Sequence, residues 1–352
     1  MNERRTIDLR SDTVTLPTLA MLEAIVAAPL GDDVQGEDPT VNRLEALAAE
    51  RMGKEAALLV TSGTMGNLVS LMAHGGHGDE VIIDTEAHIY WYEQGGLCSI
   101  AGYTPKLVPS RDGLMVPEDI EAAIRPSNPH FPVPHLLCLE NTHNRGGGRA
   151  VSPDLFAKYC DVARRHNLRI HLDGARIFNA AVAGGVDVTE FTRHVDSVQF
   201  CFSKGLSAPI GSAVAGDREF VARARRARKR LGGGMRQAGI VAAACIVALE
   251  EGPKRLHEDH ANAKLLASLI EKIDGLKLVK TPVDTNMVFV DVSGLGVPTP
   301  RLVGELLKRG VRVNPTGPQE LRFVTNRMVN ESDIREAALI LAEVTRGGRP
   351  ER

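Results

Sequence analysis

The feature that most constrains the fold is a regular alternation of short apolar runs and longer helical patterns between residues 55 and 215. The apolar runs are AALLV, EVIID, PKLVP, HLLCLE, RIHLD and SVQFCFS, and the helical patterns between them include GNLVSLMAH and PDLFAKYCDVARRH. Strands that are apolar along their whole length are typical of parallel sheets covered by helices on both faces. We therefore predict a large α/β domain with a mainly parallel central sheet, which together with an N-terminal segment spans residues 1–251.

The pattern changes after Gly252 and Pro253. The remaining chain predicts a helix, two strands, a second helix, two more strands and a final helix, with Asn330 as the N-cap and Asp333 in the first turn. We predict that residues 252–352 form a smaller C-terminal α+β domain.

Charge and cysteine content exclude several classes of partner. The 42 basic and 44 acidic residues give a net charge of −2, so we expect no nucleic acid and no anionic membrane as a partner, despite a basic cluster at Arg218 to Arg236. Five scattered cysteines without a C-x-x-C motif indicate the reducing cytoplasm. The N-terminal MNERRTIDLR lacks the apolar core of a signal peptide, and the longest apolar run, Ile240 to Leu249, is too short to span a membrane.

Four polar residues directly follow strand-like runs, namely Ser62, Glu140, Asp173 and Lys204. Ligands of parallel sheets bind at the carboxyl ends of the strands, so these side chains are predicted to converge on one rim. Lys204 has two interpretations. It either marks the point where a strand surfaces into a loop, or it is an amine kept near apolar walls so that its neutral form attacks a carbonyl.

Three further features fit a phosphorylated aromatic ligand. In TSGTMGNLVSLMAH, Ser62, Gly63 and Thr64 begin a helix whose free N–H groups suit a phosphate, although the same residues also fit an ordinary helix cap. Asp173 could keep a pyridine nitrogen protonated, or it could pair with Arg176. His88 could stack on an aromatic ring, or it could be a packing residue.

Together these parts are the set needed to hold pyridoxal 5'-phosphate as a Schiff base on Lys204. No metal site is predicted. The histidine pairs His74/His77 and His257/His260 lack the third ligand or the glutamate of known metal motifs.

At these residues the chain resembles the low-specificity L-threonine aldolases, pyridoxal-phosphate enzymes with the aspartate-aminotransferase-like fold. The resemblance covers nearly the whole chain and rests on the segments DLRSDTVT, GDDVQGEDPT, SGTMGNL, ENTHN, HLDGARIFNA, GGGMRQ and LRFVT. It implies cleavage of L-threonine or L-allo-threonine to glycine and acetaldehyde. The alternatives are a phenylserine-type aldolase or a β-eliminating lyase, which need nearly the same first set of ligands.

The resemblance also implies roles for individual residues. It assigns the Schiff base to Lys204, ring stacking to His88, the pyridine nitrogen to Asp173, the phosphate to Ser62, Gly63, Thr64 and a neighbouring subunit's Arg236, the substrate carboxylate to Ser11, Arg176 and Arg322, and a substrate-side position to His130. The base that takes the β-hydroxyl proton is His88, His130 or a water held by one of them.

Two consequences concern assembly and specificity. Because Arg236 is expected to cross an interface, the resemblance implies a homotetramer with active sites between subunits, and the basic cluster is then interpreted as interface and phosphate contact. Gln35 stands where the family usually has tyrosine, and the FPVPH segment after His130 is also atypical. Both departures lie towards the substrate side, so they bear on the β-substituent rather than on the cofactor.

Overall fold

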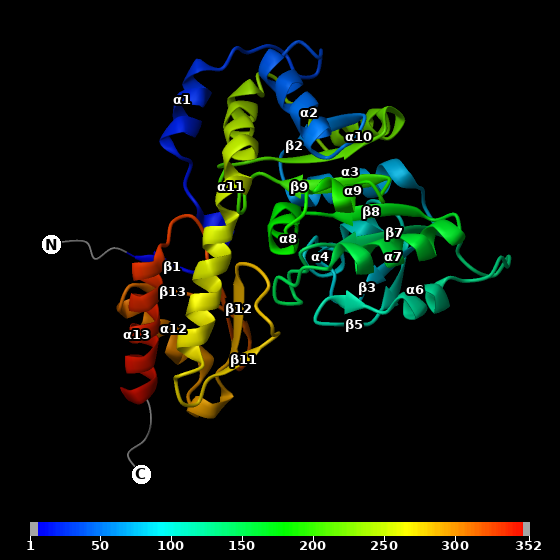
Figure 1. Ribbon diagram of the computed structural model, residues 1–352. Coiled ribbons are helices and arrows are strands. Elements are labelled where there is room, and N and C mark those ends of the chain that lie inside the picture. Colours follow the sequence, from blue (N-terminus) through cyan, green and yellow to red (C-terminus); the bar gives the residue numbers. More distant parts are fainter. Residues whose placement is uncertain (1–5, 348–352) are drawn as a thin grey trace.

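The computed structural model describes residues 6–347, and its larger part is built on a seven-stranded sheet (Figure 1). The strand order is β2–β10–β9–β8–β7–β3–β4. The pairs from β9 to β4 are parallel, whereas β10 is antiparallel to both β2 and β9. The strands are β2 (Ala56–Val60), β3 (Glu80–Asp84), β4 (Thr104–Val108), β7 (Pro134–Glu140), β8 (Arg169–Asp173), β9 (Ser197–Cys201) and β10 (Ser212–Gly216).

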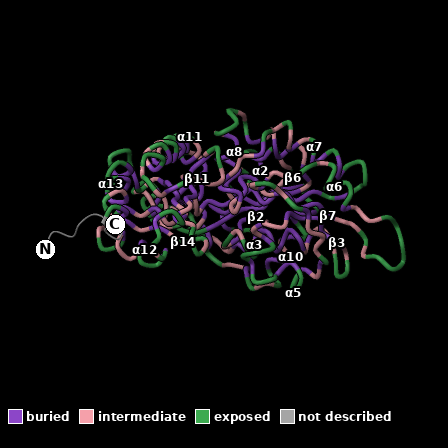
Figure 2. Tube along the Cα trace, turned by 90° about the horizontal axis from the view of Figure 1, so that it is seen from below, coloured by how far each residue is buried: buried purple, intermediate pink, exposed green. Residues whose placement is uncertain are grey.

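Helices cover both faces of this sheet, which explains why its strands are apolar throughout. One face packs against α3 (Gly63–His74) and α10 (Arg218–Arg230), and the other against α2 (Pro39–Arg51), α7 (Pro153–Arg165), α8 (Ile177–Gly184) and α11 (Gly239–Ile270). The strands run through the buried interior (Figure 2). The mainly parallel α/β sheet predicted from the alternating pattern is confirmed.

A second core surrounds a four-stranded antiparallel sheet with the order β11–β12–β15–β14. Its strands are β11 (Lys277–Val279), β12 (Met287–Asp291), β14 (Asn314–Gly317) and β15 (Glu320–Val324). The sheet is covered by the second half of α11, α12 (Thr299–Lys308) and α13 (Glu331–Gly347). The N-cap prediction for the last helix is confirmed, because the side chains of Asn330 and Asp333 each accept the other's backbone N–H.

The two cores share one long helix. α11 runs without interruption through Pro253, so the predicted division at residues 251/252 falls inside it. The chain's N-terminal end also joins the second core, where Ile7 and Leu9 are buried and β1 (Ile7–Asp8) pairs parallel with β13 (Val311–Arg312). We retain the two-domain division as a proposal, with α11 as the shared element; residues 1–5 and 348–352 of the two predicted domains lie outside the described residues.

Shorter elements complete the chain. They are the helices α1 (Leu19–Ala27), α4 (His88–Trp91), α5 (Gly96–Ser99), α6 (Pro117–Ala123) and α9 (Thr189–Thr192), the hairpin β5 (Ser110–Arg111) and β6 (Leu114–Met115), and the 3-10 turns η1 (Asp12–Val14) and η2 (Ser293–Leu295). None of the helices within residues 6–347 is both long enough and apolar enough to cross a bilayer.

Candidate active site

Polar side chains meet at the carboxyl-end edge of the large sheet. Glu140, Asp173 and Gln199 are aligned across neighbouring strands by register. β2 runs in the same direction as β9, because each is antiparallel to β10. The segments that follow β2, β3 and β9, which carry Ser62, His88 and Lys204, therefore leave the sheet at this same edge.

The N-terminus of α3 offers free backbone N–H groups close to β9. Ser62 is the N-cap, and its hydroxyl accepts the N–H of Met65. Among the described residues, the N–H groups of Gly63 and Thr64 have no hydrogen-bond partner. A Cβ on Gly63 would approach Cys201 Sγ to 2.9 Å, so the glycine keeps the helix start close to β9. Two free donors at a positive helix end suit a phosphate.

Asp173 is buried and doubly hydrogen-bonded. Its Oδ2 accepts from Asn67 Nδ2 at 3.0 Å, and its Oδ1 accepts from the N–H of Ala175 at 3.1 Å. Its predicted alternative partner, Arg176, pairs elsewhere. The same Asn67 nitrogen donates to Glu93 Oε1 at 2.9 Å. Burial, assisted by Asp173 and Glu140, raises the pKa of Glu93 to about 8.

His88 is held by two glutamates. The backbone N–H of His88 donates to Glu140 Oε2 at 2.7 Å, and the ring nitrogen Nε2 lies 3.6 Å from Glu93 Oε1. Burial lowers the pKa of His88 although the carboxylates of Asp173 and Glu140 act to raise it, so the imidazole is neutral at neutral pH. The ring leans against Tyr92, with centroids 5.5 Å apart.

Lys204 lies in the turn after β9 and is partly buried. Its carbonyl accepts the N–H of Ser207, whose φ of 68° turns the chain back sharply. Burial is the largest influence on the pKa values of Asp12, Glu93 and His88, and the charge of Lys204 lowers all three. The amine therefore lies in electrostatic contact with the rest of the cluster.

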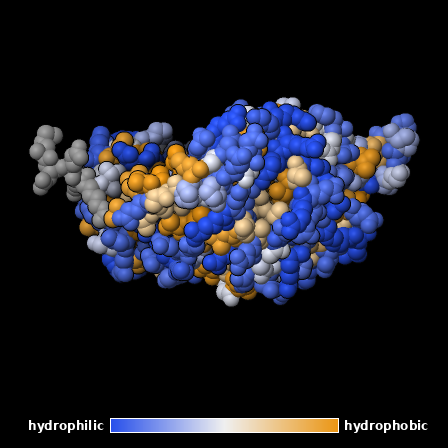
Figure 3. All heavy atoms as spheres, turned by 90° about the horizontal axis from the view of Figure 1, so that it is seen from above, coloured by the Kyte–Doolittle hydropathy of each residue, from blue (hydrophilic) through white to orange (hydrophobic). Residues whose placement is uncertain are grey.

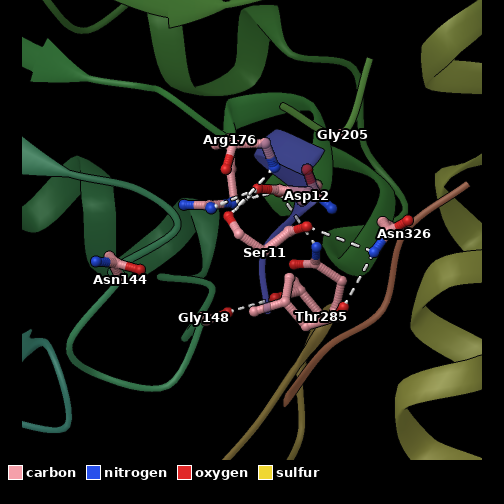
Figure 4. Close-up of polar contacts among 12 residues, drawn as sticks. Ser11, Asp12, Asn144, Gly148, Arg176, Gly205, Thr285 and Asn326 are labelled. Carbon is pink, nitrogen blue, oxygen red and sulfur yellow. Dashed lines mark hydrogen bonds and ion pairs between the residues drawn. The ribbon is translucent and has the colours of Figure 1, made fainter. Parts of the chain in front are cut away.

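Arg176 is paired inside the protein (Figure 4). Its Nε and Nη2 donate to the two carboxylate oxygens of Asp12 at 2.6 and 2.7 Å, and both side chains are buried. Although burial acts in the opposite direction, Arg176 holds the pKa of Asp12 below its ordinary value. Ser11 lies beside this pair and caps η1 through its hydroxyl, which accepts the N–H of Thr13.

Arg322 extends from β15 of the second core towards the same space. It donates to Asn144 Oδ1 at 3.2 Å and to the carbonyl of Arg10 at 3.3 Å, and its buried Nε has no hydrogen-bond partner within residues 6–347. No ion pair joins it to a carboxylate in the described part of the chain. Burial and then the charge of Arg176 lower the pKa of Arg322. The guanidinium of Arg322 therefore keeps a positive charge and a hydrogen-bond donor available for an anionic ligand.

Two predicted site residues lie apart from this cluster. His130 is exposed, in a loop between α6 and β7 that projects from the edge of the molecule (Figure 1). Arg236 is exposed and pairs with Asp32 at 2.8 Å. Neither residue contacts the side chains of Asp173, His88 and Lys204 at the sheet edge of its own chain.

Other residues of interest have structural partners. In the basic cluster, Arg228 is buried against Asp33, and Arg225 pairs with Glu45. His74 contacts Ser197, and no group of three or more potential metal ligands occurs in residues 6–347. Sequence reasoning missed Asp12, Asn67, Glu93 and Asn144. Asp12, Asn67 and Asn144 stood in quoted motifs, but without a role.

The sheet and the residues at its edge define the class of the protein: it is an α/β enzyme with the fold of the pyridoxal-phosphate-dependent transferases. A family model described as "Beta-eliminating lyase" matches residues 8–294. The chain belongs to this family.

Curated relatives refine the comparison. Low-specificity L-threonine aldolase 1 of Arabidopsis thaliana is 46% identical over 94% of both chains. The low specificity L-threonine aldolase of Escherichia coli is 44% identical, over 94% of this chain and 97% of that protein. The resemblance predicted from the motifs is confirmed.

Solved structures confirm the fold. A threonine aldolase from Leishmania major superposes with a TM-score of 0.83 at 19% identity, over 96% of this chain and 99% of that chain. A serine palmitoyltransferase from Sphingomonas wittichii superposes with a TM-score of 0.78, over 99% of this chain and 89% of that chain.

Proposed function

We propose that the protein is a pyridoxal-phosphate-dependent aldolase that cleaves L-threonine and L-allo-threonine to glycine and acetaldehyde. The observation that carries the proposal is the convergence of Lys204, Asp173 and the start of α3 at one sheet edge, in a chain 44–46% identical to low-specificity L-threonine aldolases. We further propose a role in threonine catabolism, because the reaction consumes threonine.

The donor set at the sheet edge fits pyridoxal phosphate. Ser62, Gly63 and Thr64 offer hydroxyls and two unpaired N–H groups for the phosphate. The buried Asp173 supplies the acid partner for a ring nitrogen, and Lys204 supplies the amine. When bound, the protonated cofactor ring accepts the electron pair released as the Cα–Cβ bond of the substrate breaks.

The arginines determine how the substrate is oriented. Arg322 has donors without a carboxylate partner, and Arg176 uses only Nε and Nη2 for Asp12, which leaves Nη1 for a ligand. With the hydroxyl of Ser11 they form a clamp for the substrate carboxylate. A fixed carboxylate limits rotation of the substrate, so that one bond at Cα is presented for cleavage.

Proton transfer falls to a histidine or to a water that it holds. The base removes the β-hydroxyl proton as acetaldehyde leaves, and glycine forms when Cα is reprotonated. Within one chain, His88 is neutral and adjacent to the site, so it can accept a proton. His130, on its projecting loop, can take part only in the site of another subunit.

Features of the surface support a homotetramer with shared sites. α1 exposes an apolar stripe of Leu19, Leu22 and Val26, of which Val26 is 88% exposed. Apolar patches gather on this upper face of the molecule (Figure 3). Asp32 lies in the segment after α1 and Arg236 in the segment before α11. We propose that a second copy binds at this face and that Arg236 contacts the phosphate site of that copy. Five free cysteines support the reducing cytoplasm as the compartment.

Trapping of the Lys204 amine tests the proposal. Borohydride reduction of the protein with pyridoxal phosphate is expected to leave the adduct on the peptide that contains Lys204, and Lys204→Ala is expected to be colourless and inactive. Lys54→Ala is the control, because Lys54 is also partly buried but donates to the carbonyl of Val195. An adduct on another lysine would overturn the assignment.

Product analysis separates the candidate reactions. The four threonine stereoisomers are offered, with glycine and acetaldehyde expected from the L and L-allo forms. Pyruvate and ammonia from a cysteine-like substrate would favour the β-elimination named by the family description. Faster cleavage of a phenylserine would favour an aldolase for bulky β-substituents.

A further inference from the structure

We infer that Asn67 is a positioning residue: it holds the Asp173 carboxylate in the orientation needed to face the cofactor's ring nitrogen, and it is itself held by a buried series of hydrogen bonds through His171 and Ser197. The inference rests on the proposed cofactor site. Asn67, His171 and Ser197 have no assigned part in substrate binding or proton transfer in the proposed function.

The chain of contacts is continuous and buried. His171 Nε2 lies 3.2 Å from Asn67 Oδ1, and His171 Nδ1 lies 2.8 Å from Ser197 Oγ. His74 Nε2 lies 2.6 Å from the same hydroxyl. Asn67, His171 and Ser197 are each no more than 1% exposed. Because residues two apart on a strand point to the same face, His171 and Asp173 both face α3.

Every hydrogen bond in this series has a defined donor and a defined acceptor. Asn67 donates through its nitrogen to both Glu93 and Asp173, so its oxygen can only accept. His171 therefore carries its proton on Nε2. Burial lowers the pKa of His171 to about 4, so the ring is neutral and its Nδ1 accepts the Ser197 hydroxyl. Ser197 in turn accepts from His74, whose pKa is likewise lowered by burial.

This order has a chemical consequence at Asp173. Asp173 receives two hydrogen bonds, from Asn67 and from the N–H of Ala175, and these donors solvate its carboxylate inside the protein. A buried acid and a pyridine nitrogen share one proton as an ion pair or as a neutral pair. A poorly solvated ion pair tends to neutralise. Asn67 thus favours the form in which the proton stays on the ring, where it is needed to accept electrons.

Asn67 also links Asp173 to the neighbouring Glu93 and His88. Glu93 lies 3.6 Å from His88 Nε2, and Asn67 bonds to Glu93 and Asp173 through one nitrogen. Rotation of the Asn67 amide would break both bonds at once. His171 prevents that rotation, because it offers a donor only to an oxygen.

The test uses pyridoxal phosphate labelled with 15N in the ring and bound to the holoenzyme. In the wild-type protein the 15N resonance is expected at the position of a protonated pyridine at neutral pH. In Asn67→Leu it is expected to move towards an unprotonated pyridine, and cofactor affinity, measured by titrating the apoprotein, is expected to fall about tenfold. The matched control is Ser70→Ala, which removes a buried hydroxyl of the same helix that bonds only to the carbonyl of Gly66.

A pair of variants at His171 keeps the test decisive if Asn67→Leu does not fold. His171→Leu removes the donor to Asn67 and is expected to shift the resonance in the same direction, whereas His171→Gln retains a donor near the Nε2 position and is expected to restore it. An unchanged 15N shift in every folded variant would overturn the inference. Failure of the wild-type protein to bind the cofactor would instead refute the proposed function.

Discussion

Charge is balanced unevenly among the residues of the site. Arg176 is neutralised by Asp12 through two hydrogen bonds, whereas Arg322 keeps its charge against neutral oxygens of Asn144 and Arg10. An unbalanced, partly buried cation attracts an anion more strongly than a paired one. In the proposed site, Arg322 would therefore supply most of the attraction for a substrate carboxylate, and Arg176 would mainly fix its direction.

Titration of Glu93 should make the stability of the protein depend on pH. Its pKa is about 8 in the folded protein, and a free glutamate titrates near ~4.3. Between these values the folded state binds a proton that the unfolded state has lost. The stabilisation is present in full below the lower value and is lost as the pH rises through the higher one.

Glu93→Gln should therefore flatten the decline in the free energy of unfolding between pH ~4.3 and about 8, which in the wild-type protein has a limiting slope of about 1.4 kcal/mol per pH unit from this group. Urea unfolding of the cofactor-free protein across this range measures it. Glu121→Gln is the control, because Glu121 is exposed and its pKa is lowered by His166. Parallel curves for wild type and Glu93→Gln would show that Glu93 titrates normally.

At the scale of elements, α3 combines three roles in one helix. Its first turn offers N–H groups, its glycines allow close contact with β9, and its second turn carries Asn67. The close contact at Gly66 is especially tight, since a Cβ there would lie 2.5 Å from Gln199 Cγ. The distance between α3 and β9 therefore sets the distance between the proposed phosphate donors and Lys204.

Two glycine-to-alanine changes in helices should have opposite effects. Gly66→Ala is expected to destabilise the protein by about 1–3 kcal/mol through overpacking and to weaken cofactor binding. Gly304→Ala, in α12, meets no atom within 4 Å and is expected to stabilise by about 0.5–1 kcal/mol through helix propensity. Thermal unfolding and cofactor titration of both variants measure this. Equal behaviour of the two would show that α3 can shift away from β9 at little cost.

At the scale of the whole molecule, the site joins parts that belong to both cores. Arg322 comes from the small sheet, Ser11 and Asp12 from the N-terminal segment, and Lys204 from the large sheet. α11 connects the two cores as one continuous helix, with Pro253 inside it. The exposed apolar stripe of α1 lies outside both cores and is the contact that we propose for a second copy.

Mixing of two inactive variants tests whether the site is shared between subunits. Lys204→Ala and Arg236→Ala, refolded together, are expected to recover aldolase activity, because a hybrid contains one site with both residues intact. The control mixture is Lys204→Ala with Asp173→Ala, which should stay inactive because both residues belong to one chain's sheet edge. If the first mixture also stays inactive, Arg236 does not act across an interface.

Much of the fold and part of the site followed from local pattern. The apolar runs predicted six strands of the large sheet, because burial on both faces requires apolar residues throughout. β10 was missed, since its sequence SAVAG consists mostly of small residues that give a weak strand pattern. The continuity of α11 was also missed, because a proline usually ends a helix and only tertiary packing on both cores sustains it here.

By itself the sequence determined the strand-and-helix order, the motifs of the family and the residue types that follow each strand, because these depend on neighbours along the chain. Only the tertiary structure decided which of those residues meet. Asp12 and Arg176 are 164 positions apart and Asn67 and Asp173 are 106 apart, so their pairing depends on how sheet and helices pack. Local periodicity carries no information about such distant partners, and burial then decides which charges are paired and which remain available to a ligand.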